Sequence, residues 1–162
     1  MSRYVTKNDM ACIERWIRKL ESGDARKSSD EYVARKLDLP YRVVGSGKHR
    51  IVYDLENGCV LKVAKAVSGI VGNTREIKLY FDGPPSLQKH LCKIVDHGRG
   101  WIIMEKLDRQ IPKGDDHKKQ LKKIVSRFSQ SRIELSDLKR ANLRYNDDKD
   151  VIIVDYANYD TA

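Results

Sequence analysis

The first hydrophobic pattern along the chain has helical spacing. Ile13, Trp16, Ile17 and Leu20 recur at i, i+3, i+4 and i+7, so they share one face of a helix. The segment TKND, which starts at Thr6 ahead of this stripe, resembles a helix-capping signal. We therefore predict an amphipathic helix near the start of the chain.

A second short helix is predicted after the polar stretch ESGDARKSSD. Ser28 with Glu31 provides the cap, and the helix ends before Pro40 because proline disfavours helical backbone in the residue that precedes it. We expect residues 1–39 to form an N-terminal helical extension. Two short helices on a basic chain could read DNA, but such a pair more commonly serves as packing or lid material.

From Tyr41 the hydrophobic pattern becomes that of strands. The runs YRVVGSG, RIVYDL and CVLKVAK are short and rich in β-branched residues. The Glu56-Asn57-Gly58 segment predicts a hairpin turn, since Asn-Gly tolerates positive φ angles. A helix follows over 72–81, with Ile77 and Tyr80 or Phe81 on one side, and Pro84-Pro85 stops it.

The remaining elements complete an α+β pattern. CKIVDHG and GWIIMEKL predict two strands joined by the Gly98-Arg99-Gly100 turn, and ANLRYN and VIIVDY predict a hairpin near the end of the chain. Between these strand pairs, residues 116–130 predict a helix with an apolar face and a basic face. The apolar face consists of Leu121, Ile124, Val125 and Phe128. The basic face consists of Lys118, Lys119, Lys122, Lys123 and Arg127.

Composition narrows the classes of protein. The chain has 162 residues, of which 40% are hydrophobic and 34% charged, which is typical of one globular domain. The net charge of +9 points to an anionic partner: nucleotide phosphates, nucleic acid or an acidic protein surface. No apolar run is long enough to cross a membrane, and the first residues lack the apolar core of a secretory signal. Cys12, Cys59 and Cys92 form no CxxC pair, so neither a disulfide framework nor a zinc site is expected, and we expect a cytoplasmic protein.

Candidate chemistry in the first half of the chain rests on a glycine loop, a lysine and a glutamate. Gly45-Ser46-Gly47 joins two predicted strands and would let backbone N–H groups approach a phosphate, although such a segment is more commonly a simple turn. Lys62 lies inside the apolar run VLKVAK, where burial would be costly unless its ammonium meets an anion; the simpler alternative is a strand with one solvated face. Glu76 lies on the following helix, where most glutamates are exposed.

The second half of the chain carries a sharper signal. Asp137 and Asn142 are five residues apart in DLKRAN, directly before a predicted strand, and Asp155 ends the apolar strand VIIVD. Carboxylate and amide oxygens at these places suit a hard cation such as Mg²⁺. The alternative is a set of polar loop residues that cap turns.

Taken in order, these segments resemble the protein-kinase-like superfamily over residues 41–159. GSGKHRIV resembles the glycine-rich loop, VLKVAK the third strand with its lysine, and IIMEKLD the hinge that grips adenine. DLKRAN resembles the catalytic loop and VDYAN the metal-binding DFG segment. The resemblance implies a small antiparallel N-lobe sheet with one helix at 40–107, and a truncated C-lobe at 108–162. The strongest matches are VLKVAK and DLKRAN with Asp155.

The resemblance also implies roles for individual residues. Lys62 would hold the α- and β-phosphates of ATP and pair with Glu76, while Asn142 and Asp155 would hold Mg²⁺. Asp137 would accept the proton of the acceptor hydroxyl, and Lys139 would reach the γ-phosphate. The remaining nucleotide contacts would come from Gly45, Ser46, Gly47, Val52, the gatekeeper Met104, Glu105 and Leu107.

Four departures from the family pattern qualify these roles. Arg50 replaces the third glycine of GxGxxG and is expected to point to solvent, with a phosphate contact as the alternative. Leu135-Ser136 replaces the His-Arg pair, which argues against activation by loop phosphorylation. DFG appears as Asp155-Tyr156-Ala157, which alters the packing behind the metal carboxylate. Seven residues follow Asp155, so we expect neither an activation segment nor the helical subdomain that presents protein substrates.

Three functions remain open from the sequence. The first is a minimal ATP-dependent, Mg²⁺-dependent phosphotransferase acting on a Ser or Thr hydroxyl of a protein substrate. The second is an ATP-binding pseudokinase that regulates a partner protein. The third is a nucleic-acid or acidic-partner module built on the lysine-rich helix at 116–130 and the N-terminal pair of helices. It is disfavoured because such a basic face is more commonly only solvated, and because no aromatic residues alternate with the lysines to stack on bases.

Overall fold

The computed structural model describes residues 2–23, 29–114 and 116–162, in two compact units. The first unit contains the chain up to Ile77 together with Ile94–Lys106, and the second contains Lys78–Lys93 and Leu107–Ala162. Among the described residues, no helix has both the length and the apolar character needed to cross a membrane.

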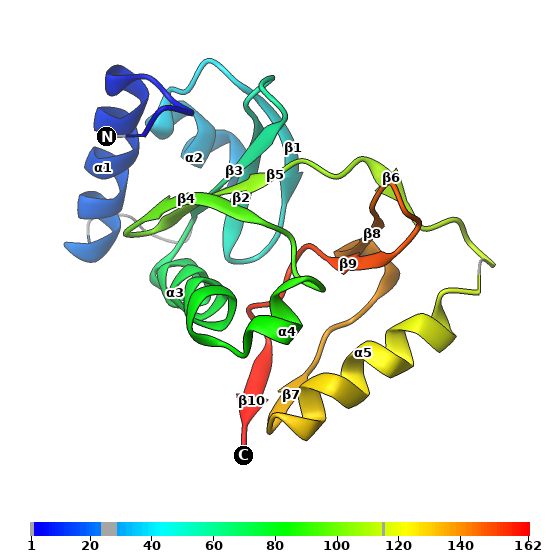
Figure 1. Cartoon of the computed structure of the whole chain (residues 1–162). Helices are drawn as coiled ribbons and strands as arrows, with labels where there is room; N and C mark the ends of the chain where they lie inside the picture. Colours follow the sequence, from blue (N-terminus) through cyan, green and yellow to red (C-terminus); the bar gives the residue numbers. More distant parts are fainter. Residues whose placement is uncertain (1, 24–28, 115) are drawn as a thin grey trace. The chain divides into compact units, whose positions relative to one another are not determined.

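The first unit is built on a five-stranded antiparallel sheet (Figure 1). Its strands follow the order β1-β2-β3-β5-β4. Their bounds are β1 Arg42–Ser46, β2 Arg50–Asp54, β3 Cys59–Ala64, β4 Ile94–Gly98 and β5 Trp101–Glu105. All five strands were predicted, β1 to β3 from runs rich in β-branched residues, and β4 and β5 from the two runs that flank the Gly98-Arg99-Gly100 turn. The turn between β2 and β3 takes positive φ at Glu56 (56°) and Gly58 (84°), which is why a glycine is needed there.

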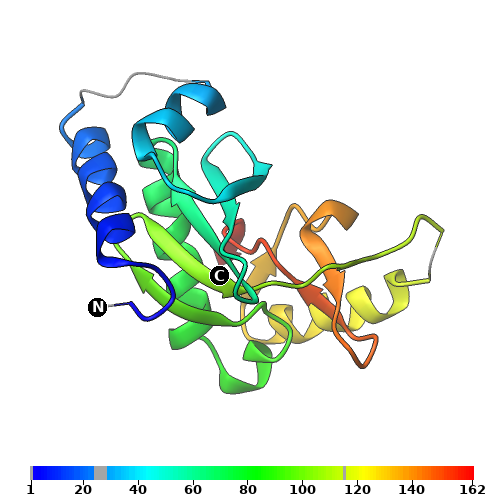
Figure 2. The ribbon, with the colours of Figure 1, turned by 90° about the horizontal axis from the view of Figure 1, so that it is seen from above.

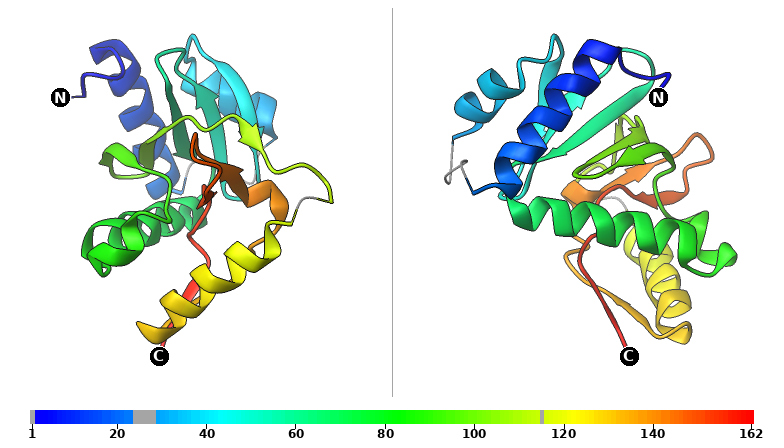
Figure 3. Two further views of the ribbon diagram at one scale, coloured as in Figure 1. Left: turned by 45° about the vertical axis from the view of Figure 1, so that its right-hand side comes forward. Right: turned by 90° about the vertical axis from the view of Figure 1, so that its left-hand side faces the viewer.

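Two N-terminal helices cover one face of this sheet, α1 (Lys7–Glu21) and α2 (Asp30–Leu37). The predicted stripe of α1 packs in one core with the inward-facing residues of β2, β3 and β5, and Figures 2 and 3 show α1 lying along the sheet. The indole Nε1 of Trp16 donates to the carbonyl of Ala64 at 2.8 Å, which ties α1 to the end of β3. The extension is therefore part of the fold of this unit.

Both helices begin at side-chain caps. The hydroxyl of Thr6 accepts from the backbone N–H of Asp9 at 3.0 Å, and the Asp9 carboxylate accepts from the N–H of Thr6 at 3.2 Å, which completes a capping box. Helix α2 is capped by Ser29, whose hydroxyl accepts from the N–H of Tyr32. Ser28, the predicted cap of α2, lies outside the described residues.

Replacing Thr6 by alanine is expected to cost about 1 kcal/mol of unfolding free energy, because an N–H at the start of α1 loses its acceptor. The melting temperature, followed by circular dichroism, should fall by roughly 2–4 °C. Thr6→Ser keeps the hydroxyl and should melt close to the parent. Equal falls in melting temperature for Thr6→Ala and Thr6→Ser would show that the capping hydroxyl is not the cause of the loss.

Helix α3 (Val67–Asp82) begins five residues before the predicted start. The additional first turn, residues 67–71, contains Gly69. The glycine is required by packing: a Cβ at Gly69 would lie 2.1 Å from the carbonyl oxygen of His49 and 3.0 Å from the Cα of Ala64. Of the two alternatives for the inward side of α3, Tyr80 is buried and Phe81 is exposed.

The second unit contains short elements around α5 (Lys118–Gln130). A three-stranded sheet has the order β6-β8-β9, and β7 pairs with β10. The bounds are α4 Pro85–Gln88, β6 Arg109–Gln110, β7 Ile133–Leu135, β8 Leu143–Tyr145, β9 Val151–Ile153 and β10 Tyr159–Thr161, with a 3₁₀ turn at Arg140–Asn142. The β8–β9 hairpin and α5 agree with the predictions. Strands β6, β7 and β10 were not predicted, because two or three residues carry no period of their own.

Candidate active site

Lys62 lies on the face of the first unit's sheet that is opposite α1. Its neighbours Leu61 and Val63 point into the core beneath α1, so alternation turns Lys62 the other way. Val52 on β2 and Ile102 on β5 stand directly opposite Lys62 and therefore share its face. The lysine stem thus lies among apolar side chains.

Lys62 pairs with the glutamate that the kinase resemblance implies. Its Nζ lies 3.5 Å from Oε1 of Glu76, and the exposed fractions of the two side chains are 9% and 0%. The simpler readings, a solvated strand face for Lys62 and an exposed helix face for Glu76, are both wrong. The pair joins β3 to α3 within one unit.

Arg50 is a third member of this buried cluster. Its side chain is 10% exposed; Nη1 donates to Oδ1 of Asn73 at 2.9 Å and to the carboxylate of Glu76. The expectation that Arg50 points to solvent is therefore wrong. The reason is its place in β2, where residues 51 and 53 face α1 and residue 50 must face α3.

The cluster places one carboxylate against two cations away from water. Buried charges are tolerated only when they are paired and hydrogen-bonded, and Glu76 accepts a hydrogen bond from Arg50 and forms an ion pair with Lys62. Asn73, one turn before Glu76 on α3, completes the group, and its buried Nδ2 has no hydrogen-bond partner among the described residues. Sequence reasoning missed Asn73, because an isolated asparagine in a helix carries no signal.

The glycine loop is held by a second lysine that sequence reasoning also missed. Nζ of Lys65 donates to the carbonyl of Gly47 at 2.8 Å and to the hydroxyl of Ser46 at 3.2 Å, and it pairs with Asp30 of α2. The hydrogen bond from Lys65 holds the pKa of Asp30 below its usual value. The loop is thus tied to the end of β3 and to α2. A Cβ at Gly47 would meet nothing within 4 Å, so the loop leaves open space there.

The residues matched to the adenine hinge lie at the end of β5. Met104 is buried and opposes Val60 of β3 and Ile94 of β4. Since Ile102 and Met104 are two residues apart on one strand, Met104 shares the sheet face of Lys62. Glu105 is exposed at the strand end, and Leu107 begins the next stretch of the second unit.

In the second unit, Asp137 stands at the centre of a polar group. Asn142 donates from Nδ2 to the backbone carbonyl of Asp137 at 2.9 Å and to its Oδ2 at 3.4 Å, and Nδ2 of Asn158 donates to the same Oδ2 at 3.3 Å. Nζ of Lys139 lies 3.6 Å from Oδ1 of Asp137. Asn158 was not predicted, because it is 21 residues from Asp137 along the chain.

Asn142 directly precedes β8, and Asp155 lies two residues after the end of β9. The N–H of Val154 donates to the carbonyl of Asn142 at 2.9 Å, and Leu143 opposes Ile153 in the β8–β9 ladder. Because β8 and β9 are antiparallel, the two metal-ligand candidates lie at the same end of this pair of strands. Tyr156, in the position of the DFG phenylalanine, is buried and donates its hydroxyl to the carbonyl of Cys92 at 2.9 Å, which anchors the segment behind Asp155.

The donors in this unit fit a magnesium ion that is partly coordinated by a ligand. Nδ2 of Asn142 donates to the backbone carbonyl of Asp137, so the side-chain oxygen of Asn142, Oδ1, remains for a cation. The described residues contain no group of three or more His, Cys, Asp and Glu able to hold a metal. Mg²⁺ is commonly held by one or two carboxylates together with substrate phosphates, and this donor set suits that arrangement.

Comparison with known proteins shows the fold. No protein-family model matches the chain. No curated protein matches its sequence. The fold does match solved structures. Monomeric WbdD aligns with a TM-score of 0.61 and 14% sequence identity, over 95% of this chain and 57% of that chain. The bifunctional kinase-methyltransferase WbdD aligns with a TM-score of 0.59 and 16% sequence identity. The structure of WbdD with the kinase inhibitor LY294002 aligns with a TM-score of 0.60 and 15% sequence identity.

These likenesses establish a protein-kinase-like α+β fold. The alignment with the bifunctional WbdD covers 76% of this chain and 35% of that chain, and the inhibitor complex aligns over 78% and 34%. The chain thus spans between about a third and somewhat over half of the length of the WbdD structures that it matches.

Proposed function

We propose that the protein is an ATP-dependent phosphotransferase that moves the γ-phosphate to a hydroxyl, with a Ser or Thr of a protein as the acceptor. The observation that carries the proposal is the buried Lys62–Glu76 pair on an apolar sheet face. A lysine in the middle of a strand is costly to bury, and a structural core would more simply use an apolar residue there. A phosphate-binding role explains why the ammonium is kept.

Each group of the site has a task in this proposal. Lys62, positioned by Glu76, neutralises the α- and β-phosphates, and the tether of Lys65 to Gly47 and Ser46 positions the glycine loop. Asn142 and Asp155 hold Mg²⁺, which supplies charge neutralisation on the phosphates when it is bound. Asp137 takes the proton of the acceptor hydroxyl, and Lys139 beside it counters charge on the γ-phosphate.

The buried position of Arg50 extends this proposal. Arg50 and Lys62 bind the same carboxylate, so Arg50 ties Glu76 of α3 to strand β2 and holds it in place for Lys62. The pair with Lys62 is then assembled without a phosphorylated loop. This agrees with the absence of the His-Arg pair before Asp137, where the chain has Leu135-Ser136.

Mg·ATP is expected to raise the melting temperature of the parent protein and not that of Asp155→Ala. Saturation at about 100 times Kd adds about 2.7 kcal/mol, or roughly 5–10 °C for a chain of this size. Differential scanning fluorimetry with ATP, with Mg²⁺ and with both measures the effect. Asp160→Ala, an exposed acid on β10, is the matched control and should respond like the parent. A parent protein that does not respond to Mg·ATP would refute the proposal.

Incubation with γ-labelled ATP then separates transfer from binding. Label on the protein itself or on an offered protein substrate supports the phosphotransferase. Saturable ATP binding without any transfer or hydrolysis would instead identify an ATP-binding pseudokinase that acts on a partner protein.

A further inference from the structure

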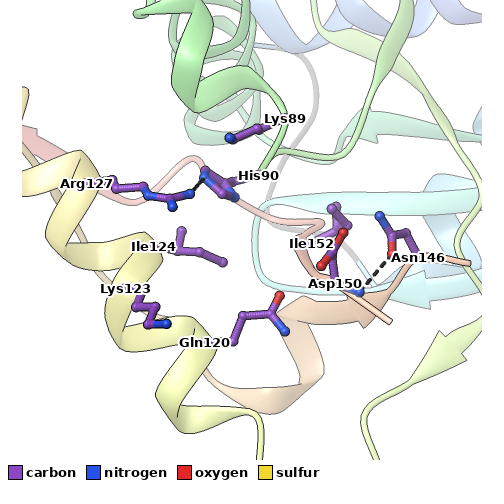
Figure 4. Close-up of a pocket in the computed structure, with 9 residues that line it drawn as sticks. All are labelled: Lys89, His90, Gln120, Lys123, Ile124, Arg127, Asn146, Asp150 and Ile152. Atoms are coloured by element: carbon purple, nitrogen blue, oxygen red, sulfur yellow. Dashed lines mark hydrogen bonds between the residues drawn. The ribbon is translucent and has the colours of Figure 1, made fainter. Parts of the chain in front are cut away.

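The second unit has a pocket whose lining includes none of the residues assigned to nucleotide, metal or proton transfer (Figure 4). Its volume is about 370 Å³, within the range of small-molecule sites. Three segments form it: residues 89–90 after α4, one face of α5, and the β8–β9 turn together with Ile152 of β9. The face of α5 involved belongs to the lysine-rich helix that the phosphotransferase leaves without a role.

The charge of this lining is mainly positive. The lining contains three cationic side chains, Lys89, Lys123 and Arg127, and one carboxylate, that of Asp150. Neither Lys89 nor Lys123 forms an ion pair or a side-chain hydrogen bond with a described residue. Two ammonium groups are therefore available to an incoming anion.

His90 lies among the cationic side chains of the pocket. Nη1 of Arg127 lies 3.0 Å from Nε2 of His90, and because a guanidinium only donates, the ring accepts at Nε2 and carries its proton on Nδ1. Burial lowers the pKa of His90, and the charges of Arg127 and Lys89 lower it further, while Asp150 acts in the opposite direction. A neutral imidazole held by an arginine leaves the other donors of Arg127 for a ligand.

The floor of the pocket is apolar and its walls are fixed. Ile124 of α5 and Ile152 of β9 are buried beneath the charged side chains. The N–H of Ile153 donates to the carbonyl of His90 at 2.9 Å, which joins that segment to β9. Oδ1 of Asn146 accepts from the N–H groups of Asp148 and Asp150 at 3.0 and 2.8 Å, so the turn is braced as well. The shape is preformed and is not made by flexible surface lysines alone.

We propose that this pocket binds a small organic phosphate, with the phosphate on Lys89, Lys123 and Arg127 and the organic part over Ile124 and Ile152. A phosphate monoester dianion matches the excess of positive charge, and Arg–phosphate and Lys–phosphate hydrogen bonds are among the strongest polar contacts. The apolar floor distinguishes an organic phosphate from the free ion. This site is separate from the proposed phosphotransfer chemistry and stands or falls without it.

The probe is phenyl phosphate, titrated into the full chain at constant ionic strength. The histidine ring signals followed by NMR are few, because the chain has four histidines. We expect a saturable shift of the His90 signals. Lys123→Gln and Arg127→Gln should each weaken binding about tenfold, as expected for loss of one charge-assisted contact.

Lys122→Gln is the matched control, since it removes the same charge from the adjacent residue of α5, which does not line the pocket. It should change the affinity by less than about twofold. Asp155→Ala should leave the titration unchanged, which keeps this test independent of ATP binding.

Four outcomes would overturn the proposal. Equal weakening by Lys122→Gln and Lys123→Gln would assign the effect to the basic face of α5 as a whole. A single-stranded oligonucleotide whose affinity responds to the variants in the same way would point to nucleic acid. Inorganic phosphate binding as tightly as phenyl phosphate would exclude an organic ligand. A His90 shift that fails to saturate would exclude a site.

Discussion

Glu76→Ala is expected to lower the free energy of unfolding by about 3–5 kcal/mol, since it leaves Arg50 and Lys62 as buried cations without the carboxylate that both bind. For a chain of this length the melting temperature should fall by on the order of 10 °C. Thermal and urea unfolding, followed by circular dichroism, measure the loss. Glu76→Gln keeps an acceptor oxygen and should lose less.

The matched control for this prediction is Glu21→Ala. Glu21 pairs with Arg99 at 2.6 Å, but the exposed fractions of the two side chains are 35% and 70%. An exposed pair contributes about 0–1 kcal/mol, so this variant should melt within a few degrees of the parent despite its short contact. If the two alanine variants lose the same stability, burial is not what makes the Glu76 cluster important.

Asp137→Asn is expected to reduce phosphotransfer by about 10²–10⁴-fold while ATP binding is retained, because the amide cannot accept the proton of the acceptor hydroxyl. Asparagine is a better test than alanine at this position. Asp137 has φ 55°, a left-handed conformation that asparagine tolerates, and an amide oxygen can still accept from Asn142 and Asn158. The folded structure should therefore survive the substitution.

The comparison requires kcat from labelled ATP and ATP affinity from the thermal shift, measured on the same preparation. Asp147→Asn, in the exposed β8–β9 turn, is the control for the chemical change and should keep parental rates. Full transfer by Asp137→Asn would remove Asp137 from the role of base. A parallel loss of ATP binding would show that it acts on the nucleotide instead.

Local pattern was sufficient for most elements of the fold. The stripe of α1, the five strands of the sheet and the β8–β9 hairpin follow from hydrophobic patterns that are contained within each segment. Helix α3 begins five residues earlier than predicted, and its first turn contains Gly69, a glycine that only the close approach of His49 and Ala64 explains. Strands β7 and β10 exist through their pairing with each other, which no local pattern contains.

The sequence by itself determined the α+β order of elements, the presence of Lys62, Glu76, Asp137, Asn142 and Asp155 in kinase-like segments, and the basic face of one helix. Only the tertiary structure decided what these residues touch. Arg50 reaches Glu76 across 26 residues, and Asn158 reaches Asp137 across 21. Such contacts depend on strand alternation and packing between distant segments, so the same arginine that local reasoning assigned to solvent is buried on a shared carboxylate.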